Sequence, residues 1–187
     1  MNPAVFLDRD GTLVEEVGYL DRLDRLQLFP WSVDAVRLLN RAGFAVVVVS
    51  NQAGVARGFC TEAFVGEVQR AIDERMAAAG GRIDGWYYCP HHPDAPLSQY
   101  RRQCECRKPR PGMIRQAERD LGIDSTGSYV IGDRWLDVRL AHAVGARGIL
   151  VRTGYGATEE HEPPEGVVAD AVVDNLIDAV SWLLRSP

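Results

Sequence analysis

Two aspartates stand two residues apart directly after an apolar run near the start of the chain. The run is Ala4-Val5-Phe6-Leu7, and Asp8-Arg9-Asp10-Gly11-Thr12 follows it. A short apolar run bounded by turn residues predicts a buried strand, which places both carboxylates at the carboxyl end of that strand. One carboxylate of such a pair can attack a phosphorus atom while the other supplies or removes a proton. Because a lone Asp-x-Asp is more often the polar end of a strand, the rest of the chain has to decide between these interpretations.

Polar residues also follow two other apolar runs. Ser50 and Asn51 end the run 44–49, and Asp133 follows the run 128–132. The carboxyl ends of parallel strands lie at one edge of an open sheet, and such folds bind ligands beyond that edge. The sequence therefore predicts that these residues gather around the first aspartate pair. Taken singly, Ser50-Asn51 would more often be an ordinary turn, and Asp133 would more often be a helix N-cap.

The elements that would position these residues alternate along the chain. The strand-like runs are 4–7, 44–49, 128–132 and 147–151, with a shorter one at 83–88. Segments of helical periodicity separate them, which is typical of a parallel sheet wrapped by helices. We therefore predict an α/β fold with a doubly wound, mainly parallel, Rossmann-like sheet. A chain of 187 residues is long enough for one domain and short for two, so residues 1–187 are predicted to form a single domain.

Each predicted helix shows one apolar face. In the helix after Pro30, that face consists of Trp31, Ala35, Leu38 and Ala42. In the helix after Thr61, a suitable N-cap, it consists of Val65, Val68, Ile72 and Met76. A third helix is predicted from Pro111 to Gly122, and a closing helix from Asn175 to Leu184. Residues 154–166 are rich in Glu, Pro and Gly, which predicts a surface loop.

The charge and composition exclude some classes of partner. The net charge is -5 and the 21 basic residues are scattered, whereas binding to a phosphate backbone relies on clustered Lys and Arg. No apolar run approaches the ~18 residues needed to span a bilayer, and no basic-apolar leader precedes the first strand. We therefore expect a cytoplasmic protein with a small-molecule partner, without nucleic-acid or membrane partners, and a monomer by default.

Cysteine and histidine side chains cluster in the irregular segment 89–110. Cys89-Pro90-His91-His92 and Cys104-Glu105-Cys106 supply three thiols and two imidazoles. Thiolate and imidazole ligands at short paired spacings suit tetrahedral Zn2+, and a site closed by four protein ligands would be structural. The alternative, buried apolar cysteines, is less compatible with three of them in one polar, proline-rich segment. The fourth cysteine, Cys60, fits no cluster and is expected to be a half-exposed thiol.

The motifs and their order resemble those of the phosphatases of the haloacid dehalogenase superfamily. The matching motifs are Asp8-x-Asp10-Gly11-Thr12, Ser50-Asn51, Lys108 and Gly132-Asp133-x-x-x-Asp137. Within this superfamily the chain is most similar to the subfamily of heptose bisphosphate and histidinol phosphate phosphatases, and the similarity covers nearly the whole chain. Many superfamily members carry a separate cap domain, but only about forty residues separate Asp10 from Ser50, which leaves no room for one.

The resemblance implies a two-step hydrolysis. Asp8 would form an aspartyl-phosphate, and Asp10 would first protonate the leaving alcohol and then activate water. Ser50 and Lys108 would contact the transferring phosphate, whose negative charges repel an anionic nucleophile unless cations stand between them. Oxygen ligands for Mg2+ would come from Asp8, Asp133 and the backbone carbonyl of Asp10.

The resemblance also assigns the metal ligands of the zinc loop, residues 89–110. These would be Cys89, His91, Cys104 and Cys106. His92 would be left over, exposed or behind the ligands, and Asp137 could ligate the magnesium ion, orient the site or cap its helix. Because the zinc ligands end just before Lys108, zinc would fix an otherwise structureless segment and aim this lysine at the phosphate.

Short loops would recognise the leaving group. The candidate substrate-binding residues are Glu16, Val17, Gly18, Tyr19, Asn51, Gln52, Ala53, Arg57, Arg107 and Arg134. Backbone amides from Asn51 onward can donate to phosphate oxygens, and Arg107 can pair with a distal phosphate or with sugar hydroxyls. Arg134 departs from the subfamily, in which lysine is frequent at this position.

The implied substrate is heptose 1,7-bisphosphate, hydrolysed at C7 within the pathway that makes nucleotide-activated heptose for cell-surface glycans such as lipopolysaccharide. Histidinol phosphate is the alternative substrate, because its phosphatases share the motifs and the zinc loop. A third hypothesis is a non-catalytic, zinc-stabilised protein that binds sugar phosphates. The intact catalytic set argues against it, namely Asp8, Asp10, Lys108 and Asp133.

Overall fold

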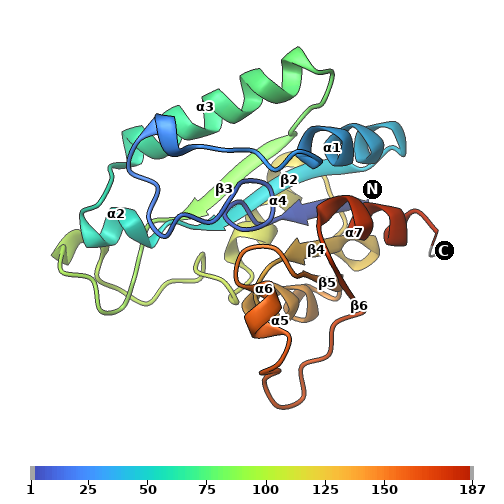
Figure 1. Cartoon of the computed structure of the whole chain (residues 1–187). Coiled ribbons are helices and arrows are strands. Elements are labelled where there is room, and N and C mark those ends of the chain that lie inside the picture. Colours follow the sequence, from blue (N-terminus) through green and yellow to red (C-terminus); the bar gives the residue numbers. More distant parts are fainter. Residues whose placement is uncertain (1–2, 186–187) are drawn as a thin grey trace.

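One parallel sheet organises the computed structural model, which describes residues 3–185. In this part of the chain, six strands follow the order β3-β2-β1-β4-β5-β6, and each neighbouring pair is parallel (Figure 1). The strands are β1 (Ala4–Leu7), β2 (Ala45–Asn51), β3 (Gly85–Cys89), β4 (Tyr129–Gly132), β5 (Arg147–Val151) and β6 (Ala171–Val173). This is the doubly wound α/β arrangement that the alternating runs predict, and its strand order changes direction between β1 and β4.

Helices cover both faces of this sheet (Figure 1). One face carries α1 (Ser32–Arg41), α3 (Glu62–Ala78) and α7 (Leu176–Leu183), and the other carries α4 (Gly112–Leu121) and α5 (Trp135–Val144). The shorter helices are α2 (Ala53–Arg57), α6 (Gly156–Glu159) and the 3-10 turns η1 (Leu23–Arg25), η2 (Ser98–Tyr100) and η3 (Ser125–Gly127). Side chains alternate across a strand, so Val5 and Leu7 pack with the first set of helices and Ala4 and Phe6 pack with the second.

Most of the element predictions are confirmed. Every predicted strand is present with small shifts of its ends, and the buried residues of α3 are the predicted Val65, Val68, Ile72 and Met76. Thr61 caps α3, because its Oγ1 accepts a hydrogen bond from the Phe64 N–H at 3.1 Å. The sequence did not predict β6, since its three residues are only half-buried at the edge of the sheet. Residues 154–166 were predicted as a loop but contain the short α6.

The predicted apolar face of α1 is partly wrong, since Trp31 and Ala35 pack in the core but Leu38 and Ala42 do not. Leu38 is 37% exposed, and the buried apolar residues of the helix are Ala35, Val36 and Leu39. The first residue of α1 explains the difference, because the Ser32 hydroxyl donates a buried hydrogen bond of 2.7 Å to the backbone carbonyl of Leu13. With Ser32 anchored in this way, Val36 and Leu39 face the core where the sequence predicted Leu38 and Ala42.

The connections at the carboxyl edge of the sheet are short. Between Asp10 and Ser50 the chain forms only loops, η1, α1 and β2, so no cap domain is inserted there, as the spacing predicts. Among residues 3–185, no helix combines the length and apolar character that a bilayer-crossing segment requires. That all 187 residues form one domain stays a prediction.

Candidate active site

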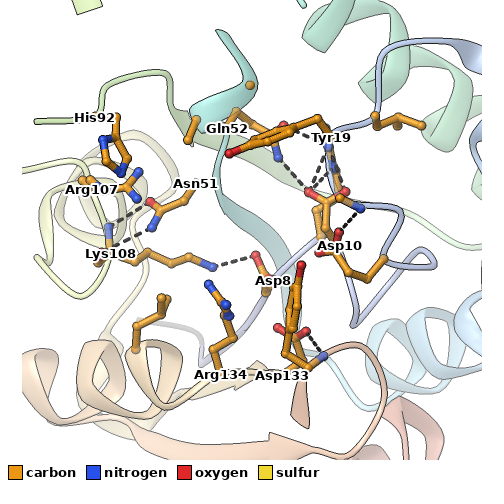
Figure 2. A pocket seen from close by; sticks show the side chains of 18 of the residues that line it. Asp8, Asp10, Tyr19, Asn51, Gln52, His92, Arg107, Lys108, Asp133 and Arg134 are labelled. Atoms are coloured by element: carbon orange, nitrogen blue, oxygen red, sulfur yellow. Dashed lines mark hydrogen bonds and ion pairs between the residues drawn. The ribbon is translucent and has the colours of Figure 1, made fainter. Parts of the chain in front are cut away.

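A cavity of about 360 Å3 lies at the carboxyl edge of the sheet. Asp8 follows β1, Asp133 follows β4, and Gln52 follows β2, while Lys108 enters from the segment after β3 (Figure 2). Doubly wound sheets bind ligands where their strand order changes direction, and here β1 and β4 meet at that point. The structure therefore brings the separate motifs of the sequence to one cavity.

Lys108 lies between two buried carboxylates. Its Nζ is 2.6 Å from Asp8 Oδ1 and 2.7 Å from Asp137 Oδ1. The same ammonium group donates to the backbone carbonyl of Val49 at 3.0 Å. The backbone of Lys108 is held as well: its N–H donates to Asn51 Oδ1 at 3.0 Å, and Asn51 Nδ2 donates to its carbonyl at 3.3 Å. These contacts fix the position of the ammonium group beside Asp8.

Asp133 is positioned by the loop that follows β5. The Tyr155 N–H donates to Asp133 Oδ2 at 2.8 Å, and Thr153 Oγ1 donates to the Gly11 carbonyl at 2.6 Å. Gly11 and Gly154 have φ angles of +82° and +57°, and a Cβ on either residue would overlap Asp133 Oδ2. Both positions therefore require glycine, because a side chain would displace the carboxylate.

Three buried carboxylates face one another in the cavity. Asp8, Asp133 and Asp137 bring ligand oxygens within 4.8 Å of one another. Burial raises the pKa of Asp8 to about 7 against the opposing charge of Lys108, and burial with repulsion from Asp8 raises the pKa of Asp133 to about 8. Burial opposes the charge of Lys108, but its ion pairs with Asp137 and Asp8 hold its pKa above the usual value. One ammonium group cannot offset three carboxylates, so this group of residues could hold a divalent cation.

Asp10 is held separately from these three carboxylates. Arg9 donates to both of its oxygens, from Nε at 3.0 Å and from Nη2 at 2.9 Å. Gln52 Nε2 donates to Asp10 Oδ2 at 2.9 Å and to Ser50 Oγ at 2.5 Å, while Gln52 Oε1 accepts from Arg9 Nη2 at 2.9 Å. Arg9 and Gln52 thereby fix the orientation of the second carboxylate of the Asp-x-Asp pair in the cavity wall.

The cysteine and histidine side chains of the segment 89–110 converge on one point. The three Sγ atoms of Cys89, Cys104 and Cys106 are 3.3 to 3.4 Å apart, and His91 Nδ1 is 3.5 Å from Cys106 Sγ and 3.7 Å from Cys89 Sγ. A tetrahedral site with zinc–sulfur bonds of about 2.3 Å has edges of about 3.8 Å, so these four atoms could hold one metal ion. Burial and the neighbouring thiol of Cys106 raise the pKa of Cys89 well above its usual range, which a bound cation would reverse.

Most of the predicted substrate-binding residues line the cavity. These are Glu16, Gly18, Tyr19, Asn51, Gln52, Ala53, Arg57, Arg107 and Arg134. Val17 does not line it, because its side chain packs against the core on the face of the sheet that carries α1, α3 and α7. Ser50 is also outside the lining: it is buried, and its Oγ is occupied by Gln52. Burial and the charge of Asp10 raise the pKa of Glu16.

Some lining residues were not predicted. They are Arg9, Leu20, Cys60, His92, Leu136 and Tyr155. Tyr155 follows β5 at the same sheet edge as the other motifs, so the edge rule could have found it. Its ring stacks under the Arg134 guanidinium, with 4.3 Å from Cζ to the ring centre. His92, which the sequence analysis left without a role, is half-buried and borders the cavity.

Comparisons with known proteins agree with this geometry. Residues 105–179 match the sequence family described as "HAD-hyrolase-like". Proteins named D-glycero-beta-D-manno-heptose-1,7-bisphosphate 7-phosphatase from Yersinia pestis and Escherichia coli (strain K12) are each 43% identical to this chain. These alignments cover 94% of this chain and 92% and 91% of the relatives, respectively.

A solved structure extends the likeness from sequence to fold. The D,D-heptose 1.7-bisphosphate phosphatase from B. bronchiseptica, complexed with magnesium and phosphate, superposes with a TM-score of 0.85 at 31% identity. The alignment covers 99% of both chains. The chain is therefore a phosphatase that belongs to the haloacid dehalogenase-like family containing these heptose bisphosphate phosphatases.

Proposed function

We propose that this enzyme removes the C7 phosphate from D-glycero-beta-D-manno-heptose 1,7-bisphosphate. The activity named for relatives of 43% identity supports this substrate. The observation that carries the proposal is the distribution of charge in the cavity. The neighbouring carboxylates of Asp8 and Asp133 are suited to a metal-assisted phosphoryl transfer. Arg57 and Arg107 line the same cavity, and neither has a carboxylate partner among residues 3–185. A substrate with two phosphates would match both features.

Asp8 is the nucleophile in this proposal. One of its oxygens attacks phosphorus, the ester P–O bond breaks, and an aspartyl-phosphate forms. Lys108 lies 2.6 Å from Asp8 Oδ1, so its ammonium group offsets charge on the transferring oxygens. The backbone amides at the start of α2, after Gln52, would donate to the same oxygens in this proposal.

Asp10 is the proton donor and later the base. The leaving alkoxide takes the proton of Asp10, and the resulting carboxylate then accepts a proton from the water that attacks phosphorus of the aspartyl-phosphate. The P–O bond to Asp8 breaks in this second step, which releases inorganic phosphate and restores the Asp8 carboxylate. Arg9 and Gln52 hold this carboxylate in one orientation through both of its oxygens. The two aspartates therefore divide the reaction between covalent and proton-transfer roles.

Mg2+ is the proposed cation for the carboxylates of Asp8, Asp133 and Asp137, with the backbone carbonyl of Asp10 as a further candidate. The raised pKa values of Asp8 and Asp133 fit a site that a divalent cation completes. The solved relative complexed with magnesium and phosphate supports this choice of ion. When bound, it would neutralise phosphoryl oxygens and orient them for attack.

Zn2+ is the proposed ion for Cys89, His91, Cys104 and Cys106. Their four ligand atoms leave no open position for a reactant, so the role is structural. The ligands end two residues before Lys108, and zinc would thereby hold the segment that carries the catalytic lysine. The monomeric state and the cytoplasmic location remain predictions.

The test compares kcat/KM on heptose 1,7-bisphosphate, histidinol phosphate and p-nitrophenyl phosphate. We expect the bisphosphate to be preferred, because histidinol carries an ammonium group that Arg57 and Arg107 would repel. Asp8→Asn should abolish hydrolysis of all three. A preference for histidinol phosphate would overturn the proposed substrate, whereas substrate binding without any turnover would overturn the enzymatic proposal.

A further inference from the structure

His92 is a cavity residue that none of the assigned roles explains. It follows the proposed zinc ligand His91, is half-buried, and lies beside Arg107 in the cavity wall (Figure 2). The loop fixes which of its nitrogens carries the proton. Its Nδ1 is 3.1 Å from the backbone N of Asp94, and because a backbone N–H can only donate, Nδ1 is the acceptor.

The proton of the neutral ring is therefore on Nε2. No group among residues 3–185 bonds to this nitrogen, whereas Nδ1 is occupied. An imidazole locked in one tautomer offers a single directional N–H donor without a charge. His92 thus presents one fixed donor at the wall of the active-site cavity.

The surroundings of His92 favour an anion. Arg107 is anchored at Nη1, which donates to the His91 carbonyl at 3.1 Å, and it has no carboxylate partner in the described chain. Arg57 ends α2 and is exposed, and its guanidinium makes no hydrogen bond or ion pair with a side chain between residues 3 and 185. Two guanidinium groups without counter-charges and one neutral donor therefore border the same part of the cavity.

We infer that His92 is a substrate-binding residue that donates from Nε2 to the phosphate that is not transferred, together with Arg57 and Arg107. The inference rests on the proposed function, because it needs a substrate with a second phosphate. The guanidinium groups attract any anion, whereas a single oriented N–H strengthens binding only when the ligand has an acceptor at one position. His92 would thereby contribute selectivity for the bisphosphate over the monophosphate.

A purely structural role for His92 is the alternative, since its ring also closes the turn at Asp94. His92→Asn separates the two roles. An asparagine accepts the N–H two residues ahead as an Asx turn, so it preserves the bond to Asp94 but places no donor where Nε2 lies. His92→Gln is the complementary variant, because its longer side chain can carry an amide donor to that place. His161→Asn is the matched control, since His161 is exposed and does not line the cavity.

The first measurement is the ratio of kcat/KM for heptose 1,7-bisphosphate to that for heptose 7-phosphate. Removing one hydrogen bond to a charged group should lower this ratio about tenfold in His92→Asn, mainly through KM of the bisphosphate. His92→Gln should recover part of the ratio, and His161→Asn should keep it. Zinc content, measured by elemental analysis, checks that the loop is intact. An equal loss on both substrates, or equal loss of the ratio in the Asn and Gln variants, would overturn the inference.

The second measurement keeps this inference distinct from the proposed function. Calorimetric titration of Asp8→Asn with heptose 1,7-bisphosphate reports binding without turnover, and adding His92→Asn should weaken it about tenfold. Equal binding by both proteins overturns only the role of His92. Weaker binding in the double variant, with no preference for this substrate in the unaltered enzyme, supports the role of His92 and overturns the proposed reaction. No binding by either protein overturns both.

Discussion

Replacing Gly154 with alanine tests whether the loop after β5 positions Asp133. A Cβ at this position would overlap Asp133 Oδ2 and would lie 2.6 Å from the Cα of Gly11, in backbone that cannot rotate aside. The residue also has a φ of +57°, which disfavours any side chain. Alanine must therefore move either the metal-ligand candidate Asp133 or the loop that holds it.

The structure sets the size of the expected effect. A left-handed conformation costs about 1–2 kcal/mol for a residue other than glycine, and overpacking a close contact costs about 1–3 kcal/mol. Gly154→Ala should therefore lower the free energy of unfolding by about 2–5 kcal/mol. A displacement of about 1 Å at Asp133 should lower kcat by about a hundredfold and weaken the binding of Mg2+.

Gly122 offers a matched control for the backbone part of this cost. Its φ is +65° at the end of α4, and a Cβ there would meet no atom within 4 Å. Gly122→Ala should therefore lose about 1–2 kcal/mol of stability and retain its activity and Mg2+ affinity. Urea unfolding, steady-state kinetics and Mg2+ titration would be measured on both variants. Normal Mg2+ affinity and turnover in Gly154→Ala, or equal damage in both variants, would refute the proposed positioning of Asp133.

Three further outcomes follow from the site. Asp10→Asn should lower kcat on a sugar phosphate by about a hundredfold or more. It should lower kcat on p-nitrophenyl phosphate less, because nitrophenolate leaves without a proton. Equal losses on both substrates would contradict the role of Asp10 as acid. Cys104→Ala should lose zinc and about tenfold in kcat, whereas Cys60→Ala should keep its zinc, as metal analysis and kinetics would show. Full zinc and normal turnover in Cys104→Ala would count against the zinc proposal. Asp8 and Asp133 have folded-state pKa values of about 7 and about 8, above the unfolded value of about 4, so the folded state binds extra protons between these limits. The metal-free enzyme should therefore lose stability as pH rises from about 5 to about 8, and added Mg2+ should stabilise it most at the upper end of this range. A Tm of the metal-free enzyme that does not change with pH would contradict these pKa shifts.

The strands of the sheet and the position of the site could be predicted because both depend on local patterns. Buried strands are short apolar runs, and the residues after them meet at one edge whatever the details of the helices. β6 escaped prediction because three half-buried residues at a sheet edge leave no distinct pattern. The face of α1 was partly misassigned because the Ser32 hydrogen bond, a contact with Leu13 across the fold, anchors its first residue.

The fine structure of the site depends on contacts between distant segments. Gly154 and Tyr155 hold Asp133 only because β5 ends next to β4, and nothing in their own residue types marks them. His92 was set aside because its neighbours are metal-ligand candidates, while its place in the cavity is set by the path of the zinc loop. Motif spacing can identify residues with chemical roles, and the sheet-edge rule could have pointed to Tyr155, but the contacts by which such residues position a carboxylate depend on how distant segments fold together.

The amide side chain of Asn51 has a consequence for how firmly Lys108 is held in place. A carboxamide offers a donor and an acceptor side by side, as a peptide group does. Asn51 uses both to pair with the backbone of Lys108, as a neighbouring strand would, although the segment around Lys108 is not a strand. Lys108 is consequently held in two ways. The Asn51 hydrogen bonds attach it to the central sheet, and the thiol cluster holds the loop that precedes it. Loss of either the Asn51 hydrogen bonds or the thiol cluster should leave a partly active enzyme. Only the loss of both should leave Lys108 without a fixed position.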